Sequence, residues 1–426
     1  MGQTPDVAPA RSGPVRHFSA GPPPTVTRST QSLTQDFIDL SFRLESGKRL
    51  SHFSRYETPI RVYAPSTASP ILLKDLSSLL QRLRSEAKID IRRVADKARA
   101  NLFIEPLGAR IVKRYFGNAA CLVAPNETSW ASYKAKGGAG PQVWQALRER
   151  RSMAIFLPKS AAPQEIRDCL HEEIAQAIGP VNDLYRLSDS VFNDDNVNVV
   201  LTATDMLFLR AYYAPELKTG MSQDAVARRL SQIFGRINPK KKTASATSSH
   251  LFSAHWKSTI ERALRPGLAI NPRINAARQA VNIAQNAGYN DARLGFSYYA
   301  YARLMSQRSP REAHAILVTA QSRLKGRPEF KLHLALIELE LAKFALAQGG
   351  FQRVDRLTRQ IGPVFQTHQN AAALSVALYL RAEALNAMGQ TEQARKLRLE
   401  ASSWGRYGLT NPTATLRSIR DLASAS

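Results

Sequence analysis

Hydrophobic residues recur with two different spacings along the chain, and the change between them divides it into two regions. Up to about residue 235, short apolar runs typical of strands alternate with helical patterns. The strand patterns cover 59–64, 101–107, 121–125 and 153–157, and the helical patterns cover 34–44, 71–88, 164–178, 201–213 and 222–235. Beyond residue 250 the strand patterns fade and helical spacing continues. The chain is therefore predicted to be α+β first and all-α afterwards.

Composition divides the chain further. Residues 1–30 are rich in Pro, Gly, Ser and Thr, which predicts a disordered leader. Residues 31–235 form the predicted α+β domain. Residues 236–250 contain the run Lys240-Lys241-Lys242 and are predicted to be a basic flexible linker. Residues 251–415 are predicted to be a helical repeat domain.

The helical part contains three similar segments, at 298–321, 335–361 and 376–401. Each is a helical pattern, a short turn and a second helical pattern, and the spacing is roughly 40 residues. The last segment resembles a tetratricopeptide repeat, with Ala384, Leu385, Gly389 and Ala394 in the matching places. A more general helical-hairpin array is the alternative interpretation. Both predict a surface that binds a protein or peptide.

One stretch, LHEEIAQAIGPVND at 170–183, carries candidate chemistry. Its helical register puts Ile166, Leu170, Ile174 and Ile178 on a core stripe. His171 and the glutamate after it begin like the zinc motif H-E-x-x-H, but alanine occupies the position of the second histidine. A zinc site that starts at His171 is therefore not expected.

A second register uses Gly179. The stretch then resembles the metzincin motif H-E-x-x-H-x-x-G-x-x-H, with Glu172, Gln176 and Asn182 in the three histidine places. Glu173 takes the place of the catalytic glutamate. SVFND at 190–194 stands where metzincins have a methionine turn, and LTATDMLFLRAYY at 201–213 resembles the helix that closes such domains.

The same segments resemble a bacterial, mainly alphaproteobacterial, domain family of unknown function whose members are often exported. Its pattern is C-x-x-E-E-x-x-Q-x-x-G-x-x-N-D, then S-x-F-N-D, then L-T-x-x-D. The matching residues are Cys169, Glu172, Glu173, Gln176, Gly179, Asn182, Asp183, Ser190, Phe192, Asn193, Asp194, Leu201, Thr202 and Asp205. The resemblance implies a metzincin-like, zincin-type fold without the three histidines, and it implies no established activity.

Two functions follow for this candidate site. The first function is that of a non-catalytic module. Carboxamides such as those of Gln176 and Asn182 are poor zinc ligands, so no cofactor is expected in this case. The second is a divergent metal-dependent peptidase or hydrolase with Glu173 as general base. In that case Glu172, Gln176 and Asn182 would hold a divalent metal. The candidate site also includes two carboxyl residues and one amide residue, Asp183, Asp194 and Asn193.

The net charge of +25 adds a possible class of partner. Residues 201–426 carry +18 of it. A basic surface attracts anionic partners, although dispersed charges on solvated helix faces are the simpler interpretation. The chain carries no recognisable nucleic-acid-binding motif.

The compartment depends on the cysteines and on the resemblance. The sequence shows no transmembrane segment and no signal peptide. The family resemblance implies a periplasmic or secreted protein. Cys121 and Cys169 would then form a disulfide, whereas in a reducing compartment they would be two core thiols.

Overall fold

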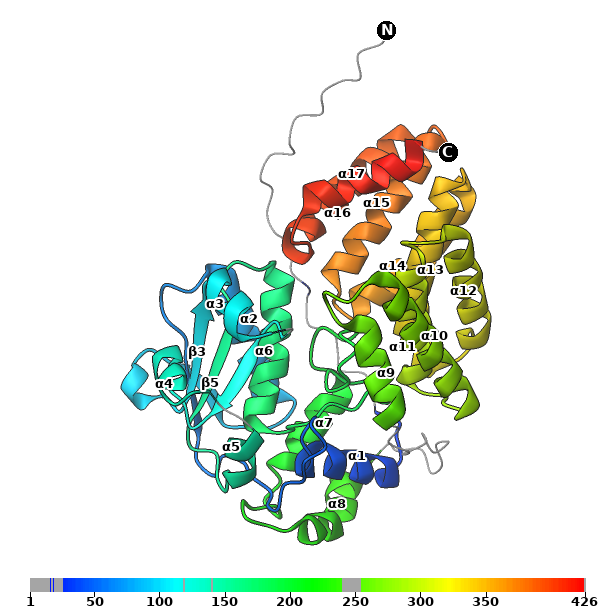
Figure 1. The fold of residues 1–426 in the computed structure, drawn as a ribbon. Helices are drawn as coiled ribbons and strands as arrows, with labels where there is room; N and C mark the ends of the chain where they lie inside the picture. Colours follow the sequence, from blue (N-terminus) through cyan, green and yellow to red (C-terminus); the bar gives the residue numbers. More distant parts are fainter. Residues whose placement is uncertain are drawn as a thin grey trace.

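The computed structural model describes Arg16, Phe18 and residues 26–117, 119–138, 141–239 and 254–424. Most of the predicted leader and residues 240–250 of the predicted linker lie outside these residues. The linker was predicted to begin at residue 236, whereas the helix before it continues to Ile237. We call residues 26–239 the first region and residues 254–424 the helical region (Figure 1). Within the described residues, no helix combines the length and the apolar character that crossing a membrane requires.

The first region is α+β, as predicted, and its elements alternate along the chain. Its strands are β1 (Ile60–Tyr63), β2 (Ile91–Val94), β3 (Leu102–Leu107), β4 (Leu122–Pro125) and β5 (Met153–Pro158). Its α-helices are α1 (Thr30–Phe42), α2 (Pro70–Ser85), α3 (Ala109–Tyr115), α4 (Trp130–Ala135), α5 (Pro141–Ala146), α6 (Pro163–Ile178), α7 (Ala203–Tyr212) and α8 (Gln223–Ile237), and a 3-10 turn covers Lys97–Arg99.

The five strands form one sheet in the order β2-β1-β3-β5-β4. The first four are parallel, and β4 runs antiparallel to β5 at one edge. Parallel neighbours need a crossover between them, and α2 provides it between β1 and β2. Alternate residues of β5 face opposite sides: Met153 and Ile155 join the main core, while Ala154 and Phe156 pack with Trp130. Both faces of the sheet are therefore covered.

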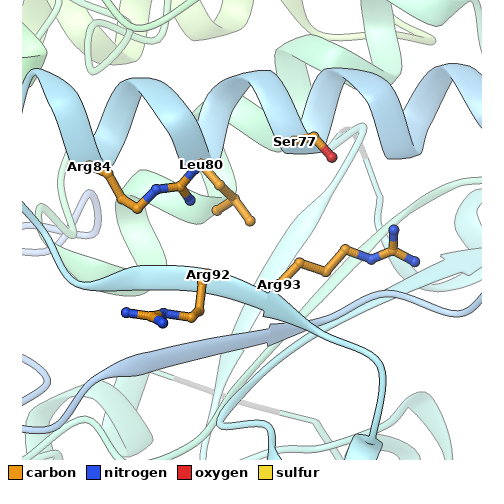
Figure 2. A pocket seen from close by; sticks show the side chains of 5 residues that line it. All are labelled: Ser77, Leu80, Arg84, Arg92 and Arg93. Atoms are coloured by element: carbon orange, nitrogen blue, oxygen red, sulfur yellow. The ribbon is translucent and has the colours of Figure 1, made fainter.

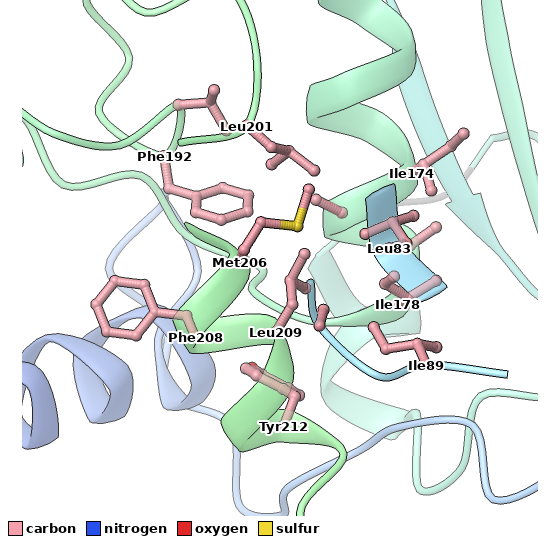
Figure 3. Packing of buried hydrophobic residues seen from close by; sticks show 14 of the residues in the cluster. Leu83, Ile89, Ile174, Ile178, Phe192, Leu201, Met206, Phe208, Leu209 and Tyr212 are labelled. Carbon is pink, nitrogen blue, oxygen red and sulfur yellow. The ribbon is translucent and has the colours of Figure 1, made fainter. Parts of the chain in front are cut away.

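The main core contains residues of the sheet and of five helices, namely α1, α2, α6, α7 and α8. Figure 3 shows Leu83 of α2, Ile174 and Ile178 of α6, and Met206 and Leu209 of α7 packed together. Phe192, in the loop between α6 and α7, is fully buried in the same cluster. This packing fixes α6 and the following loop, which carry the candidate site, against the sheet.

One strand of the sheet was missing from the sequence prediction. In β2 only Ile91 is buried, Val94 is half-buried, and Arg92 and Arg93 are exposed. An edge strand with two consecutive arginines has neither a continuous apolar run nor a clean alternation, so its pattern did not indicate a strand.

The helical region consists of hairpins, as predicted. Its α-helices are α9 (Ala254–Leu264), α10 (Ile270–Asn286), α11 (Ala292–Met305), α12 (Pro310–Leu324), α13 (Lys331–Ala347), α14 (Phe351–Thr367), α15 (Ala371–Ala387), α16 (Thr391–Gly408) and α17 (Pro412–Ser424), with a 3-10 turn at Pro328–Phe330. The three predicted hairpins are confirmed as α11–α12, α13–α14 and α15–α16. The pair α9–α10 was not predicted, and α17 continues past the predicted end at residue 415.

Residues of the predicted leader contact the last hairpin. The Phe18 ring stacks on Trp404 of α16 with 4.4 Å between centroids. Arg16 forms an ion pair of 3.1 Å with Glu400. These two residues are therefore placed against the helical region, which a prediction of disorder did not anticipate.

Helices α15 and α16 approach very closely at Gly408. A Cβ at this position would overlap the backbone of Ala371 and Ala372. We expect Gly408→Ala to lower the free energy of unfolding by about 2 kcal/mol, because backbone atoms have to move apart. Chemical denaturation measures the change. Gly108→Ala is the control, since a Cβ there meets nothing within 4 Å, and an equally large loss in that variant would contradict the explanation.

The two regions are joined by buried polar contacts. The side-chain oxygen of Gln164, in the first turn of α6, accepts hydrogen bonds from the backbone N–H groups of Ala371 (2.6 Å) and Ala372 (3.1 Å). It thereby caps the start of α15 from another domain. Arg167, one turn later, donates to the carbonyl of Gln369 at 2.6 Å. Helix α6 is therefore attached directly to the helical region.

A second set of contacts also joins the two regions. His333 Nε2 of α13 lies 3.0 Å from Asp195 Oδ2, and both side chains are at most 1% exposed. The Tyr407 hydroxyl of α16 donates to Asp75 of α2 at 2.7 Å. Tyr185 packs edge-on against Trp256 of α9. The loop after α6 thus belongs to both hydrophobic cores.

Candidate functional site

Helix α6 forms as its sequence predicts. Pro163 occupies the first turn, where a missing N–H costs nothing. The predicted stripe of Ile166, Leu170, Ile174 and Ile178 is buried. The helix ends at Ile178, and Gly179 follows it.

Space, and not a left-handed backbone, explains the glycine at position 179. Its φ is −148°, so no left-handed conformation demands a glycine. Instead, a Cβ would lie 2.8 Å from Leu209 Cδ2 of α7. Arg150 donates to the Gly179 carbonyl at 2.5 Å and to the Gln176 carbonyl at 2.7 Å. The Tyr213 hydroxyl donates to the Ile178 carbonyl at 2.9 Å, so the last carbonyls of the buried helix are satisfied.

His171 has a structural role that the sequence did not indicate. It is buried, and its Nδ1 accepts a hydrogen bond of 3.1 Å from the backbone N–H of Leu201. Burial and the nearby Arg82 and Arg167 lower its pKa well below the usual value. The neutral ring therefore ties α6 to the segment before α7.

Four predicted site residues lie close enough to influence one another's ionisation: Glu172, Glu173, Asp183 and Asp194. Glu173 and Asp183 are 6% and 8% exposed, whereas Glu172 and Asp194 are half-buried. Glu45, in the exposed loop after α1, acts on the same group and was not predicted. The structure therefore assembles a carboxyl cluster from α6 and two loops.

Burial and mutual repulsion raise the pKa values in this cluster. Burial, then Asp194 and Glu45, raise the pKa of Glu172 to about 7. The pKa values of Glu173 and Asp183 are raised well above normal, again mainly by burial. Burial raises the pKa of Asp194 to about 6, although a hydrogen bond with Tyr185 opposes the change. At neutral pH the cluster retains protons that isolated carboxyls would lose.

Two oxygens of the cluster have no hydrogen-bond partner among the described residues: Glu173 Oε2 and Asp183 Oδ1. A buried carboxylate oxygen without a donor is costly, whereas a protonated carboxyl carries less of that cost. The lack of hydrogen-bond donors at these oxygens and the raised pKa values therefore both indicate that the carboxyls are protonated in the folded protein.

This protonation predicts a pH effect on stability. The folded protein keeps a proton on Glu172 between pH 4.5 and about 7, where the unfolded chain loses it. Stability is therefore highest below pH 4.5 as far as this group is concerned, and it falls as the pH rises through 7. In Glu172→Gln, the decrease in the free energy of unfolding over this pH range should be smaller by about 1–2 kcal/mol than in the wild type. The expected difference is modest because Glu172 is only half-buried, so solvent screens part of its charge. Urea unfolding between about pH 5 and pH 8 measures it, and an unchanged slope in the variant would contradict the prediction.

The amide residues of the motif are engaged elsewhere. Asn182 donates to the Asp39 carbonyl of α1 at 2.9 Å. Asn193 donates to the Leu187 carbonyl at 3.0 Å and accepts from the Asp195 N–H at 3.2 Å. Gln176 reaches Asp183 only at 3.5 Å. Of the proposed ligand set, Asn182 therefore directs its amide nitrogen to α1 and Gln176 directs its amide nitrogen to Asp183.

The loop between α6 and α7 is held by Asp205. Its carboxylate accepts from the Ser190 hydroxyl (2.5 Å), the Val191 N–H (3.1 Å) and the Thr202 N–H (2.8 Å). Thr202 in turn caps α7 with its side chain. The S-x-F-N-D and L-T-x-x-D segments therefore form one hydrogen-bonded unit.

Among the described residues, no group of three or more His, Cys, Asp or Glu side chains is arranged to hold a metal ion. The carboxyl cluster offers oxygen atoms that suit a hard cation, but its amides are already committed to the protein.

The two cysteines are joined. Cys121, directly before β4, forms a disulfide with Cys169 in the middle of α6. The bond lies within the main core and links the antiparallel edge of the sheet to the helix that carries Glu172 and Glu173.

The comparisons with known proteins identify one part of the chain. Residues 30–232 match the model of a family described as "Protein of unknown function (DUF2927)". No curated protein and no solved structure gave a significant match. The matched range contains every strand of the sheet, helix α6, the carboxyl cluster and the loop held by Asp205. A DUF2927 domain of unknown function therefore spans residues 30–232.

Proposed function

We propose that the first region is a non-catalytic module of metzincin-like design that supports the helical region as a scaffold for a protein or peptide partner. One observation carries the proposal. Asn182 and Asn193, which would have to serve a reaction centre, hold the fold through backbone hydrogen bonds instead.

The docking of the two regions supports the same role. Gln164 and Arg167 of α6 hold the start of α15, and Asp195 contacts His333 of α13. A fixed platform under a hairpin array keeps the array's remaining surface in a defined orientation. In this proposal the array, which is tetratricopeptide-like, binds the partner.

A periplasmic or secreted location is part of the proposal. The Cys121–Cys169 disulfide supports it, because such bonds persist in oxidising compartments.

A hydrolase is the second candidate, and the carboxyl cluster favours it. Glu173 is buried, its pKa is raised, and its Oε2 has no hydrogen-bond partner among the described residues. A buried carboxyl whose pKa is raised can take part in proton transfer. Glu173 would then act as general base, with Glu172 as its proton-sharing neighbour.

Metal analysis separates the two candidates. We expect gently purified protein to contain less than stoichiometric metal, and chelation to leave its thermal unfolding unchanged. Glu173→Gln should bind no less metal than the wild type. Stoichiometric metal that is lost in Glu172→Gln, together with peptide hydrolysis that Glu173→Gln abolishes, would overturn the scaffold proposal.

A further inference from the structure

A cavity between α2 and the edge strand β2 is lined by three arginines. Its volume is about 520 Å³, and its lining consists of Ser77, Leu80, Arg84, Arg92 and Arg93. None of these residues belongs to the carboxyl cluster, and the proposed function uses none of them. Cavities of this size hold small molecules.

The cations are spread along the cavity. Figure 2 shows Arg84 reaching from α2 toward β2, while Arg92 and Arg93 extend from β2 in opposite directions. Ser77 lies on the side of Arg93, but its hydroxyl already donates to the Leu73 carbonyl of α2 at 2.8 Å. A ligand with negative charge at two points therefore fits this arrangement better than a single small anion.

The arginines differ in how far they are already neutralised. Arg84 donates to the Ile91 carbonyl at 3.0 Å, which is a neutral partner. Arg92 forms an exposed ion pair of 3.2 Å with Asp90, which also pairs with Arg61. Among the described residues, the Arg93 side chain has no hydrogen bond or ion pair. The cavity thus keeps most of its positive charge available.

The strand edge favours a small ligand over an added peptide strand. β2 has only four residues, and Arg84 already occupies the outward carbonyl of Ile91. A short edge whose backbone is partly satisfied is a poor template for strand addition. The guanidinium groups, in contrast, match the geometry of phosphate oxygens.

The surroundings favour a soluble ligand over a membrane. Among the described residues, the large hydrophobic side chains that are exposed are Tyr115, Leu264, Val318 and Leu399, and none lies on α2 or β2. A surface that binds lipid usually offers apolar side chains for insertion.

We propose that this cavity binds a soluble ligand that carries two linked phosphate groups, with Arg84 and Arg92 at one phosphate and Arg93 at the other. The proposal does not depend on the scaffold role.

Calorimetric titration of the full chain with inorganic diphosphate tests it. We expect one saturable site. Arg93→Gln should weaken binding by about tenfold or more, because one charged hydrogen-bonding partner is lost. Arg311→Gln, which removes the same charge from an exposed position on α12, should leave the affinity within about twofold. The exposed Arg93 side chain makes no hydrogen bond or ion pair with the described residues, so its replacement should keep the thermal unfolding temperature unchanged.

Orthophosphate and succinate are the comparison ligands, and vesicles with anionic lipid are the comparison surface. Weaker binding of both small anions than of diphosphate supports the proposal. It is overturned by no saturable binding, by equal losses in the Arg93 and Arg311 variants, or by orthophosphate or succinate binding as tightly as diphosphate. Binding to vesicles without binding of free diphosphate also overturns it.

Discussion

Reduction of the Cys121–Cys169 disulfide is expected to lower the free energy of unfolding by about 4 kcal/mol. The bond closes a loop with a sequence separation of 48 residues, so its loss gives the unfolded chain much more freedom. Urea unfolding of the oxidised and the reduced protein, followed by circular dichroism, measures the difference.

The cysteine-free variant is the control for this experiment. Replacing both Cys121 and Cys169 with alanine should produce the same loss and remove all sensitivity to the reductant. Free thiols that titrate in the native, unreduced protein would show that the bond is absent. Equal stability of the two redox states would show that it does not constrain the fold.

Asp36→Asn is expected to cost about 4 kcal/mol of stability. Asp36 is fully buried in α1 and accepts two hydrogen bonds from Arg186, at 3.0 and 2.6 Å. Arg28 also contacts it. Arg186 is itself buried, and burial lowers its pKa. Removing the negative charge leaves a buried guanidinium with Asp39 as its remaining carboxylate.

The neighbouring carboxylate gives a matched comparison. Asp39→Asn should cost about 1 kcal/mol, because Asp39 is partly exposed and Arg186 keeps its pair with Asp36. The double variant Asp36→Asn, Arg186→Met should recover part of the larger loss, since it removes the uncompensated charge. Equal losses of stability in Asp36→Asn and Asp39→Asn would contradict the claim that Asp36 is the main carboxylate partner of Arg186.

Helix α6 could be predicted because its determinants are local. Pro163 starts it, the stripe from Ile166 to Ile178 faces the core, and Gly179 follows its end. The α+β and all-α division, and the three predicted hairpins, were predictable for the same reason. Strand β2 could not be predicted, because the two consecutive arginines Arg92 and Arg93 interrupt the alternation of apolar and polar residues that indicates a strand.

The candidate site was less predictable because its partners come from distant parts of the chain. Glu45 and Tyr185 carry no motif, yet both act on the ionisation of Asp194. The sequence pattern assigned Asn182 to a ligand set, whereas a carbonyl of α1 decides where its side chain lies. Spacing along one helix predicts which residues share a face, but not what a loop from another element brings to it.

The contact of Gln164 with the first turn of α15 bears on how the molecule unfolds. Separating the two regions would expose the N–H groups of Ala371 and Ala372 and break the buried contact between Asp195 and His333. Loss of structure in the first region would also remove Tyr185 and Val197, which lie in the loop after α6, from the core of the helices. The DUF2927 domain and its hairpins should therefore melt in a single cooperative transition, as one folding unit rather than two.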